Sequence, residues 1–348
     1  MPRRLQDLFG IDVPIVLGPF GGLSSVSLTG AVSEAGGLGS YGLYGYAPDR
    51  ITETIAAVKA ATPKPFAVNL WLPTGDEVTP ADVELTSALA ALAPLYDAVG
   101  VAPPTLPERF LPDIADQVQA VMDAAPAVVS VVYGAPSREL VGAAHRRGIR
   151  IVGTATTVAE AVALDEAGVD AVVATGAEAA GHRVSFLRAA ENSLVGTFAL
   201  VPQVVDAVGV PVIAAGGVAD RRGVAAAFAL GASGVQVGTA FLRTRESAAT
   251  EAHRRAIARA AAEDTVLTRA MSGRLARGIP NRAMRDIEAS GAIAPFPAQN
   301  WLTGVFRAEA ARRDGGDLLS LWAGQGAPLA TRERADEVFA ELAAGVPG

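Results

Sequence analysis

Short apolar segments recur along this chain, and most of them do not alternate with polar residues. Runs of this kind are typical of parallel β-strands that are covered on both faces. They predict strands over residues 14–20, 38–43, 66–72, 128–134, 150–154, 171–175, 210–216 and 234–239. Alanine-rich stretches between them predict helices over residues 49–61, 137–147, 157–167 and 223–230. About eight strand–helix units in this order favour a TIM (β/α)8 barrel over an open doubly wound sheet.

Two segments interrupt this rhythm. Residues 73–127 form a long insertion after the third strand, and insertions at this end of a barrel usually shape substrate access. After about residue 245 the strand signal stops, and the remaining chain has the pattern of helices and loops. We therefore expect a barrel over residues 1–245 and a mostly helical C-terminal accessory or cap segment over residues 246–348.

Composition narrows the class of protein. Half of the 348 residues are hydrophobic, but no apolar run approaches the ~20 residues that a membrane helix needs. The net charge of −7 argues against a nucleic-acid-binding surface. The N-terminal segment contains Asp7 and Asp12 instead of the apolar core of a signal peptide. We expect a cytoplasmic protein with a small-molecule substrate, no nucleic acid and no membrane; whether it is a homo-oligomer stays open.

Several chemistries are disfavoured by the residues that the chain lacks. There is no cysteine, which excludes disulfides, thiolate nucleophiles and cysteine-bound metals. The only lysines, Lys59 and Lys64, are expected away from the catalytic end of a barrel, so a Schiff-base aldolase is disfavoured. No second histidine lies at ligand spacing from His182, and no Gly-x-Ser-x-Gly elbow is present, which argues against metal and serine hydrolases.

His182 is the leading catalytic candidate. It follows the sixth predicted strand among small residues that would let a ligand approach the backbone. A histidine titrates near pH ~6.5 and can take or give a proton at neutral pH. A purely structural histidine is the alternative. The other histidines, His145 and His253, lie in arginine-rich helical stretches and are expected to face solvent.

Two glycine-containing loops follow the seventh and eighth predicted strands, at Gly216-Gly217 and at Gly238-Thr239. Glycine at a strand end lets backbone N–H groups reach a phosphate, and a helix that starts just beyond adds partial positive charge. The loops at these two places often bind phosphate in TIM barrels. We predict a phosphate cradle here, with tight strand-to-helix turns as the alternative.

Two further strand ends are candidates for binding a flat ligand. The first strand ends in Gly18-Pro19-Phe20-Gly21, whose turn would present backbone groups to the barrel mouth. Asn69 ends the third strand with an amide that can donate and accept hydrogen bonds, unless it only caps a turn. Aromatic residues near strand ends either wall the pocket or belong to the core: Tyr41, Tyr44, Trp71 and Tyr133.

Taken together, these segments resemble the nitronate monooxygenases, formerly called 2-nitropropane dioxygenases. The similarity follows the chain in order through residues 18–22, 35–40, 65–70, 178–183, 214–217 and 236–239, and continues through 272–277 and 322–326. Flavin-type enoyl-acyl carrier protein reductases and NAD(P)H:quinone reductases share this barrel, so their activities remain alternatives.

The resemblance implies FMN at the mouth of the barrel. Pro19, Phe20 and Gly21 would line the isoalloxazine ring, and Asn69 would hydrogen-bond to it. The residues expected around the ribityl phosphate are Gly181, Gly216, Gly217, Gln236, Gly238 and Thr239. Gly18 and Thr175 complete the expected cofactor-binding set. His182 corresponds to the family's catalytic histidine.

The resemblance also implies the reaction. An alkyl nitronate, with a nitroalkane as a further candidate substrate, would be oxidised by O2 to a carbonyl compound and nitrite. Neutral His182 would orient the nitro oxygens and remove the α-proton of a nitroalkane. The alternatives are an NAD(P)H-dependent reductase of a quinone or enoyl thioester, and a non-catalytic barrel that binds a phosphate-bearing ligand.

Two positions depart from the family pattern, and one motif has an open role. Ala180 replaces a glycine of the common Glu-Ala-Gly-Gly-His form, and Thr175 stands where many members carry glutamine. Both changes bear on substrate choice. The segment 272–277 places an arginine either near the flavin or on a helix surface.

Overall fold

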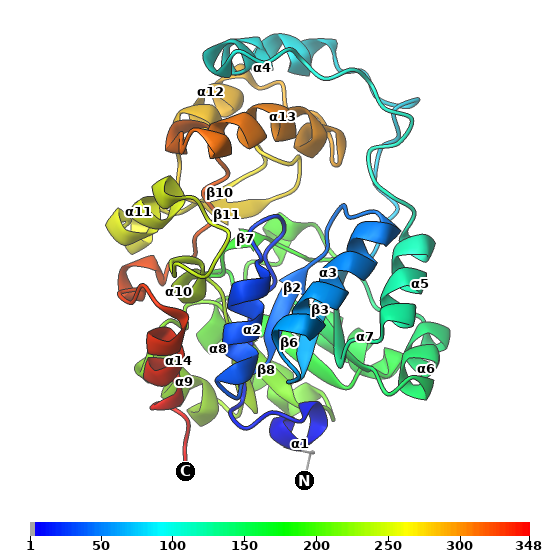
Figure 1. Ribbon diagram of the computed structural model, residues 1–348, viewed down its shortest axis with the longest axis vertical. Coiled ribbons are helices and arrows are strands. Elements are labelled where there is room, and N and C mark those ends of the chain that lie inside the picture. Colours follow the sequence, from blue (N-terminus) through cyan, green and yellow to red (C-terminus); the bar gives the residue numbers. More distant parts are fainter. Residues whose placement is uncertain (1–3) are drawn as a thin grey trace.

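Eight parallel strands form the centre of the molecule in the computed structural model, which describes residues 4–348 (Figure 1). They are β1 (Ile15–Leu17), β2 (Gly39–Gly42), β3 (Phe66–Trp71), β4 (Val128–Val132), β5 (Arg150–Ala155), β6 (Ala171–Thr175), β8 (Val212–Ala215) and β9 (Gly234–Val237). Their order is β1-β9-β8-β6-β5-β4-β3-β2. Leu38 links the two ends of this sheet, because Leu17 N–H donates to its carbonyl and its own N–H donates to Ile15, both at 2.9 Å. The predicted TIM barrel is confirmed.

Both faces of the barrel strands are buried, which explains why their sequences are apolar without alternation. Inside the barrel, alternate residues such as Val16, Ala67 and Val173 pack on α1 (Leu5–Phe9). This helix lies at the end of the barrel near the N-terminus (Figure 1). The other strand face packs against the surrounding helices. The chemistry therefore has to lie at the opposite, carboxyl end of the strands.

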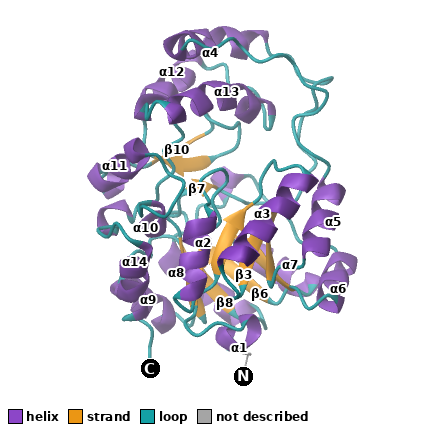
Figure 2. Ribbon diagram, in the orientation of Figure 1, coloured by secondary structure: helices purple, strands orange, loops and turns teal. Residues whose placement is uncertain are grey.

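An outer layer of helices surrounds the strands (Figure 2). It consists of α2 (Val26–Glu34), α3 (Pro48–Ala61), α5 (Ile114–Ala124), α6 (Arg138–Arg146), α7 (Val158–Ala167), α8 (Thr197–Ala207), α9 (Arg221–Ala229), α10 (Thr239–Leu242) and α14 (Ala335–Ala343). Side chains cap several helix starts; Ser25 and Thr157, for example, accept from backbone N–H groups three residues later. The C-terminal α14 packs against α2 and α9, so the end of the chain returns to the barrel.

A second group of helices lies above the barrel mouth in Figure 1. It contains α4 (Thr86–Val99), α11 (Glu251–Arg259), α12 (Arg282–Ser290) and α13 (Ala298–Arg312). Residues of α4, α12 and α13 share a separate apolar cluster that includes Leu92, Met284 and Phe306. We call this part the cap. Short 3-10 helices complete the helical elements: η1 (Ala190–Asn192), η2 (Ala262–Asp264), η3 (Gly316–Leu318) and η4 (Ala327–Leu329).

The insertion over residues 73–127 serves both parts of the molecule. Its α5 packs on α3 and covers the barrel, whereas its α4 packs against α13 in the cap. The division of the chain at residue 245 remains a prediction. The cap also contains α4 from the insertion, and α14 from the C-terminal segment packs on the barrel.

Three short strands join the cap to the barrel. They are β7 (Gly181–His182), β10 (Val266–Thr268) and β11 (Ala276–Gly278), in the antiparallel order β10-β11-β7. The expectation of only helices and loops after residue 245 was therefore wrong at two places. Strands of three residues are too short to produce a recognisable period in the sequence.

Among residues 4–348, no helix combines the length and the apolar character that crossing a membrane requires.

Candidate active site

A cavity of about 230 Å³ lies at the carboxyl ends of the barrel strands, with the cap forming its other wall. All thirteen residues predicted for the site line this one cavity: Gly18, Pro19, Phe20, Gly21, Asn69, Thr175, Gly181, His182, Gly216, Gly217, Gln236, Gly238 and Thr239. The fold thus brings together residues that are spread over more than half of the chain. Their individual roles toward a ligand remain predictions.

The two glycine loops have the geometry of an anion cradle. Gly216 and Gly217 have φ values of +100° and +73°, which favour glycine, and a Cβ at Gly216 would lie 2.9 Å from Thr197 Oγ1. The N–H groups of Gly217, Gly238 and Thr239 donate to no acceptor within residues 4–348. Thr239 Oγ1 accepts from Gly324 at 3.0 Å, which leaves its own hydrogen free to donate. Backbone donors that are unused at a helix start are expected in a phosphate-binding loop, and a simple strand-to-helix turn does not explain them.

His182 sits in β7, where its backbone pairs with Ala276 of β11. Its Nε2 lies 2.8 Å from Ser272 Oγ, and its ring lies edge-on to Trp71 with the centroids 4.9 Å apart. The ring of Trp322 lies 5.4 Å away, also centroid to centroid. The imidazole is reached from the cavity but otherwise surrounded by protein.

The imidazole is neutral under ordinary conditions. Burial, with a smaller contribution from the positive charges of Arg274 and Arg307, lowers the pKa of His182 to about 3. A neutral imidazole can accept a proton, and its surroundings favour negative charge on a bound ligand.

Two arginines supply this positive charge. Arg274 is ion-paired with Asp76 and Glu77. Arg307 of α13 lines the cavity and donates to Asn300 and Ser320, but forms no ion pair in the described part of the chain. Burial lowers the pKa of Arg307 to about 10, and Tyr44 partly offsets this effect. Arg307 therefore stays charged at neutral pH without a neighbouring carboxylate.

Of the remaining polar and aromatic candidates, some line the cavity and others lie away from it. Asn69 is buried in the cavity wall, and its Nδ2 donates to Ser130 Oγ at 2.9 Å. Tyr44 and Trp71 line the cavity, whereas Tyr133 lies behind Trp71. Tyr41 is instead paired with the Tyr46 hydroxyl, 3.4 Å away.

The structure adds residues that sequence reasoning did not assign to the site. They are Ser272, beside His182, and the cavity-lining Phe296, Asn300, Arg307, Trp322 and Gly324. Ser272, Trp322 and Gly324 belong to motifs of the family pattern, so a signal for them existed. Phe296, Asn300 and Arg307 fall outside those motifs, and only the folded cap brings them to the cavity.

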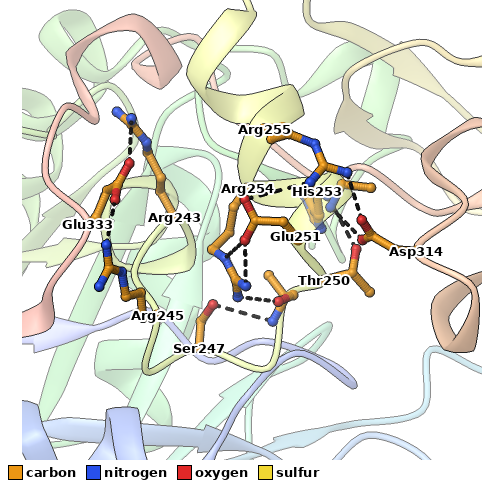
Figure 3. A network of polar contacts seen from close by, with 12 residues as sticks. Arg243, Arg245, Ser247, Thr250, Glu251, His253, Arg254, Arg255, Asp314 and Glu333 are labelled. Atoms are coloured by element: carbon orange, nitrogen blue, oxygen red, sulfur yellow. Dashed lines mark hydrogen bonds and ion pairs between the residues drawn. The ribbon is translucent and has the colours of Figure 1, made fainter.

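His253 does not face solvent as expected. Its side chain is buried, and its Nε2 lies 2.9 Å from the carbonyl oxygen of Trp322. The arginines beside it, Arg254 and Arg255, turn toward Glu251 and Asp314 at the surface (Figure 3). Helical arginines therefore indicated the exposed face correctly, but His253 lies on the other face. His145 is partly exposed and pairs with Asp170.

A flavin fits these residues. The glycine loops leave room and unused donors for a phosphate, while Phe20, Trp71 and Trp322 provide flat apolar surfaces nearby. Residues 4–348 contain no cluster of three acidic or histidine side chains that could hold a metal ion.

Comparison with known proteins identifies the family. A family model described as nitronate monooxygenase matches residues 3–345. A probable nitronate monooxygenase of Staphylococcus aureus (strain Newman) is 37% identical over 342 residues, covering 98% of this chain and 96% of the relative.

Solved structures agree with this assignment. Nitroalkane oxidase from Streptomyces ansochromogenes superposes with a TM-score of 0.87 at 35% identity, covering 98% of this chain and 96% of that one. FabK from Thermotoga maritima superposes with a TM-score of 0.76 at 30% identity, with coverage of 98% and 95%. The chain belongs to the nitronate monooxygenase family and is a flavin-dependent oxidoreductase.

Proposed function

We propose that this enzyme uses FMN to oxidise alkyl nitronates with O2, forming a carbonyl compound and nitrite. The observation that carries the proposal is the neutral His182, placed near the guanidinium groups of Arg274 and Arg307 in a cavity whose glycine loops suit a phosphate. The flavin, when bound, supplies the electron transfer between nitronate and O2.

The cofactor would be held at two places. Gly181, Gly216, Gly217, Gln236, Gly238 and Thr239 would bind the phosphate through backbone and side-chain donors. The ring would lie against Gly18, Pro19, Phe20, Gly21, Asn69 and Thr175. We propose FMN because a single phosphate satisfies the two loops; the mass of the cofactor released on denaturation separates FMN from FAD.

The charge of the cavity favours an anionic substrate. Arg307 lacks a carboxylate partner in the described chain, whereas the charge of Arg274 is offset by Asp76 and Glu77. A nitronate brings one negative charge to this region, whereas a nitroalkane is neutral. His182 would orient the nitro oxygens of either substrate, and it would act as a base only for the nitroalkane.

The two departures from the family pattern act on the space around the substrate. Gly181 has a left-handed backbone, with φ +72°, but Ala180 does not, so the Ala180 methyl group introduces no backbone strain. Both Ala180 and Thr175 line the cavity. We expect the Ala180 methyl group to narrow the approach to His182 and so to favour small nitronates.

The second candidate is an NAD(P)H-dependent reductase of a quinone or an enoyl thioester. The structural similarity to FabK supports this second candidate function. The two functions differ in what reduces the flavin when oxygen is absent. We expect a nitronate alone to bleach the flavin absorption of the purified protein anaerobically, and NADH or NADPH to do so slowly. Rapid bleaching by NAD(P)H, with none by nitronate, would establish the reductase instead.

A further inference from the structure

Arg274 lies behind the wall of the site, between two aromatic rings. Its guanidinium carbon is 4.3 Å from the centroid of the Tyr133 ring and 4.0 Å from that of Phe296. Tyr133 has φ +69°, a conformation that a bulky residue adopts only where its surroundings enforce it. Both rings also contact Trp71, which packs on His182. Arg274 is therefore fixed in one plane, close to the imidazole.

The insertion fixes the other end of this guanidinium. Arg274 Nη2 lies 2.7 Å from Asp76 Oδ1 and 2.7 Å from Glu77 Oε1. Glu77 also accepts from the backbone N–H of Thr74 and of Gly75. Burial alone would raise the pKa of Glu77, but these N–H donors and Arg274 outweigh it and lower the pKa. An ionised carboxylate thus holds the largely buried Arg274, whose burial without a partner would be unfavourable.

The backbone of Arg274 fixes the hydroxyl next to His182. Ser272 Oγ lies 3.2 Å from the Arg274 carbonyl oxygen, 3.3 Å from its nitrogen and 2.8 Å from His182 Nε2. The turn between them requires Gly273, whose φ is +84° and where a Cβ would lie 2.6 Å from the Phe296 nitrogen. This turn therefore sets the distance between the Arg274 backbone and the Ser272 hydroxyl.

These three contacts favour one protonation pattern. A serine hydroxyl has one hydrogen and can accept two hydrogen bonds. All three contacts are satisfied when Ser272 donates to the Arg274 carbonyl and accepts from both the Arg274 N–H and His182 Nε2–H. The lone pair of the imidazole is then on Nδ1, which has no hydrogen-bond partner among the described residues.

We propose that Arg274 is a positioning residue for His182: Asp76 and Glu77 hold its side chain, and its backbone holds Ser272 so that His182 carries its proton on Nε2. The insertion thereby controls which imidazole nitrogen is available as a base. This inference rests on the proposed role of His182 for its catalytic consequence, but the tautomer itself is independent of any substrate.

The tautomer is measurable directly, because the chain contains only three histidines. Nitrogen-15 NMR of histidine-labelled protein distinguishes Nε2–H from Nδ1–H, and a His182→Ala sample assigns the His182 signals. We expect a single Nε2–H tautomer for His182 in the wild type and a mixture in Glu77→Gln and in Arg274→Gln. Arg274→Lys, which keeps the charge but not the planar stacking, is expected to give an intermediate spectrum.

Asp314→Asn is the control. It removes the acceptor charge of the 2.6 Å ion pair with Arg255 in the cap, and neither residue lines the cavity (Figure 3). Asp314 has φ +53°, which asparagine tolerates well. We expect the His182 signals of this variant to match the wild type. An Nδ1–H tautomer in the wild type, or a Glu77→Gln spectrum identical to the wild type, would overturn the proposal.

Turnover gives the second readout. A nitroalkane needs the base and a nitronate does not. Glu77→Gln should therefore lower kcat/KM for the nitroalkane about tenfold relative to kcat/KM for the nitronate, mainly through a lower kcat for the nitroalkane. General damage to the fold would lower both substrates equally and leave this ratio unchanged, which would contradict the positioning role. If the wild type has the expected tautomer but consumes no nitronate, the proposed function fails while the positioning role stands.

Discussion

His182 shows how its surroundings alter a single side chain. Enclosure by protein and two nearby guanidinium groups lower the pKa of the imidazole well below its usual value, which keeps it neutral but also makes it a weaker base. The same positive groups favour an anion on the ligand. This positive field therefore favours an anionic substrate but weakens the imidazole as a base, and the charge of a bound anion would offset that weakening.

Replacing His182 with alanine separates its two proposed roles. We expect kcat/KM for a nitroalkane to fall by about 100-fold or more, because general-base catalysis is lost. For the nitronate the loss should be about tenfold or less, since only orientation is affected. Oxygen consumption with each substrate measures both values, and equal losses would refute the general-base role.

Gly238 offers a test of the phosphate cradle. Its φ of −109° is accessible to alanine, and a Cβ there would make an ordinary contact of 3.6 Å with Phe20 Cε1. We expect Gly238→Ala to leave the melting temperature of the flavin-free protein within about 2 °C of the wild type. The added methyl group should raise the Kd for FMN about tenfold in a fluorescence titration. Unchanged FMN affinity would place the phosphate elsewhere.

At the scale of elements, close approach between α2 and β2 depends on glycine. A Cβ at Gly39 would lie 2.1 Å from the carbonyl oxygen of Thr29, a backbone atom that cannot move away alone. Gly142 in α6 is the matched contrast, because its Cβ would meet only the flexible end of Arg146 at 3.5 Å.

The two glycines should therefore respond in opposite directions to alanine. We expect Gly39→Ala to lower the free energy of unfolding by about 3 kcal/mol or more. Gly142→Ala should raise it by about 0.5–1 kcal/mol, because alanine favours the helix. Urea unfolding followed by circular dichroism measures both; a tolerated Gly39→Ala would mean that α2 and β2 separate easily.

The sequence predicted long elements better than short ones, for a physical reason. Seven of the eight barrel strands begin and end within two residues of their predicted bounds, and β1 ends three residues early; burial on both faces leaves a clear apolar run. The strands β7, β10 and β11 are two or three residues long and are held by pairing instead of by pattern. The place of Arg307 in the cavity could not be predicted from the sequence either, because it depends on how α13 packs over the barrel.

For the whole molecule, the buried His253 connects the region of the site to acid stability. His253 joins α11 to the Trp322 segment, and burial lowers its pKa to about 4; the Trp322 carbonyl opposes this effect and Arg254 adds to it. Above pH ~6.5 the histidine is neutral in both the folded and the unfolded chain. Between pH ~6.5 and about 4 only the unfolded chain takes up the proton, so the free energy of unfolding decreases as the pH is lowered through this window.

The size of this effect is testable with one variant. A shift of this extent corresponds to at most about 3 kcal/mol for His253. His253→Gln keeps a donor for the Trp322 carbonyl but does not titrate. We expect its midpoint of urea unfolding to fall less than that of the wild type between pH 7 and pH 4.5. Parallel curves for the two proteins would show that His253 does not contribute.

The pairing of β7 with β11 limits how enzymes of this kind can be redesigned. The imidazole is carried by the barrel segment of the chain, yet its backbone partner and its hydroxyl neighbour come from the segment that connects α11 and α12 of the cap. A cap transplanted from a relative must supply matching residues at both places, or the imidazole loses its orientation although the barrel is untouched. A change at a single wall position such as Asn300 leaves that pairing intact, so it is the simpler route to a new substrate range.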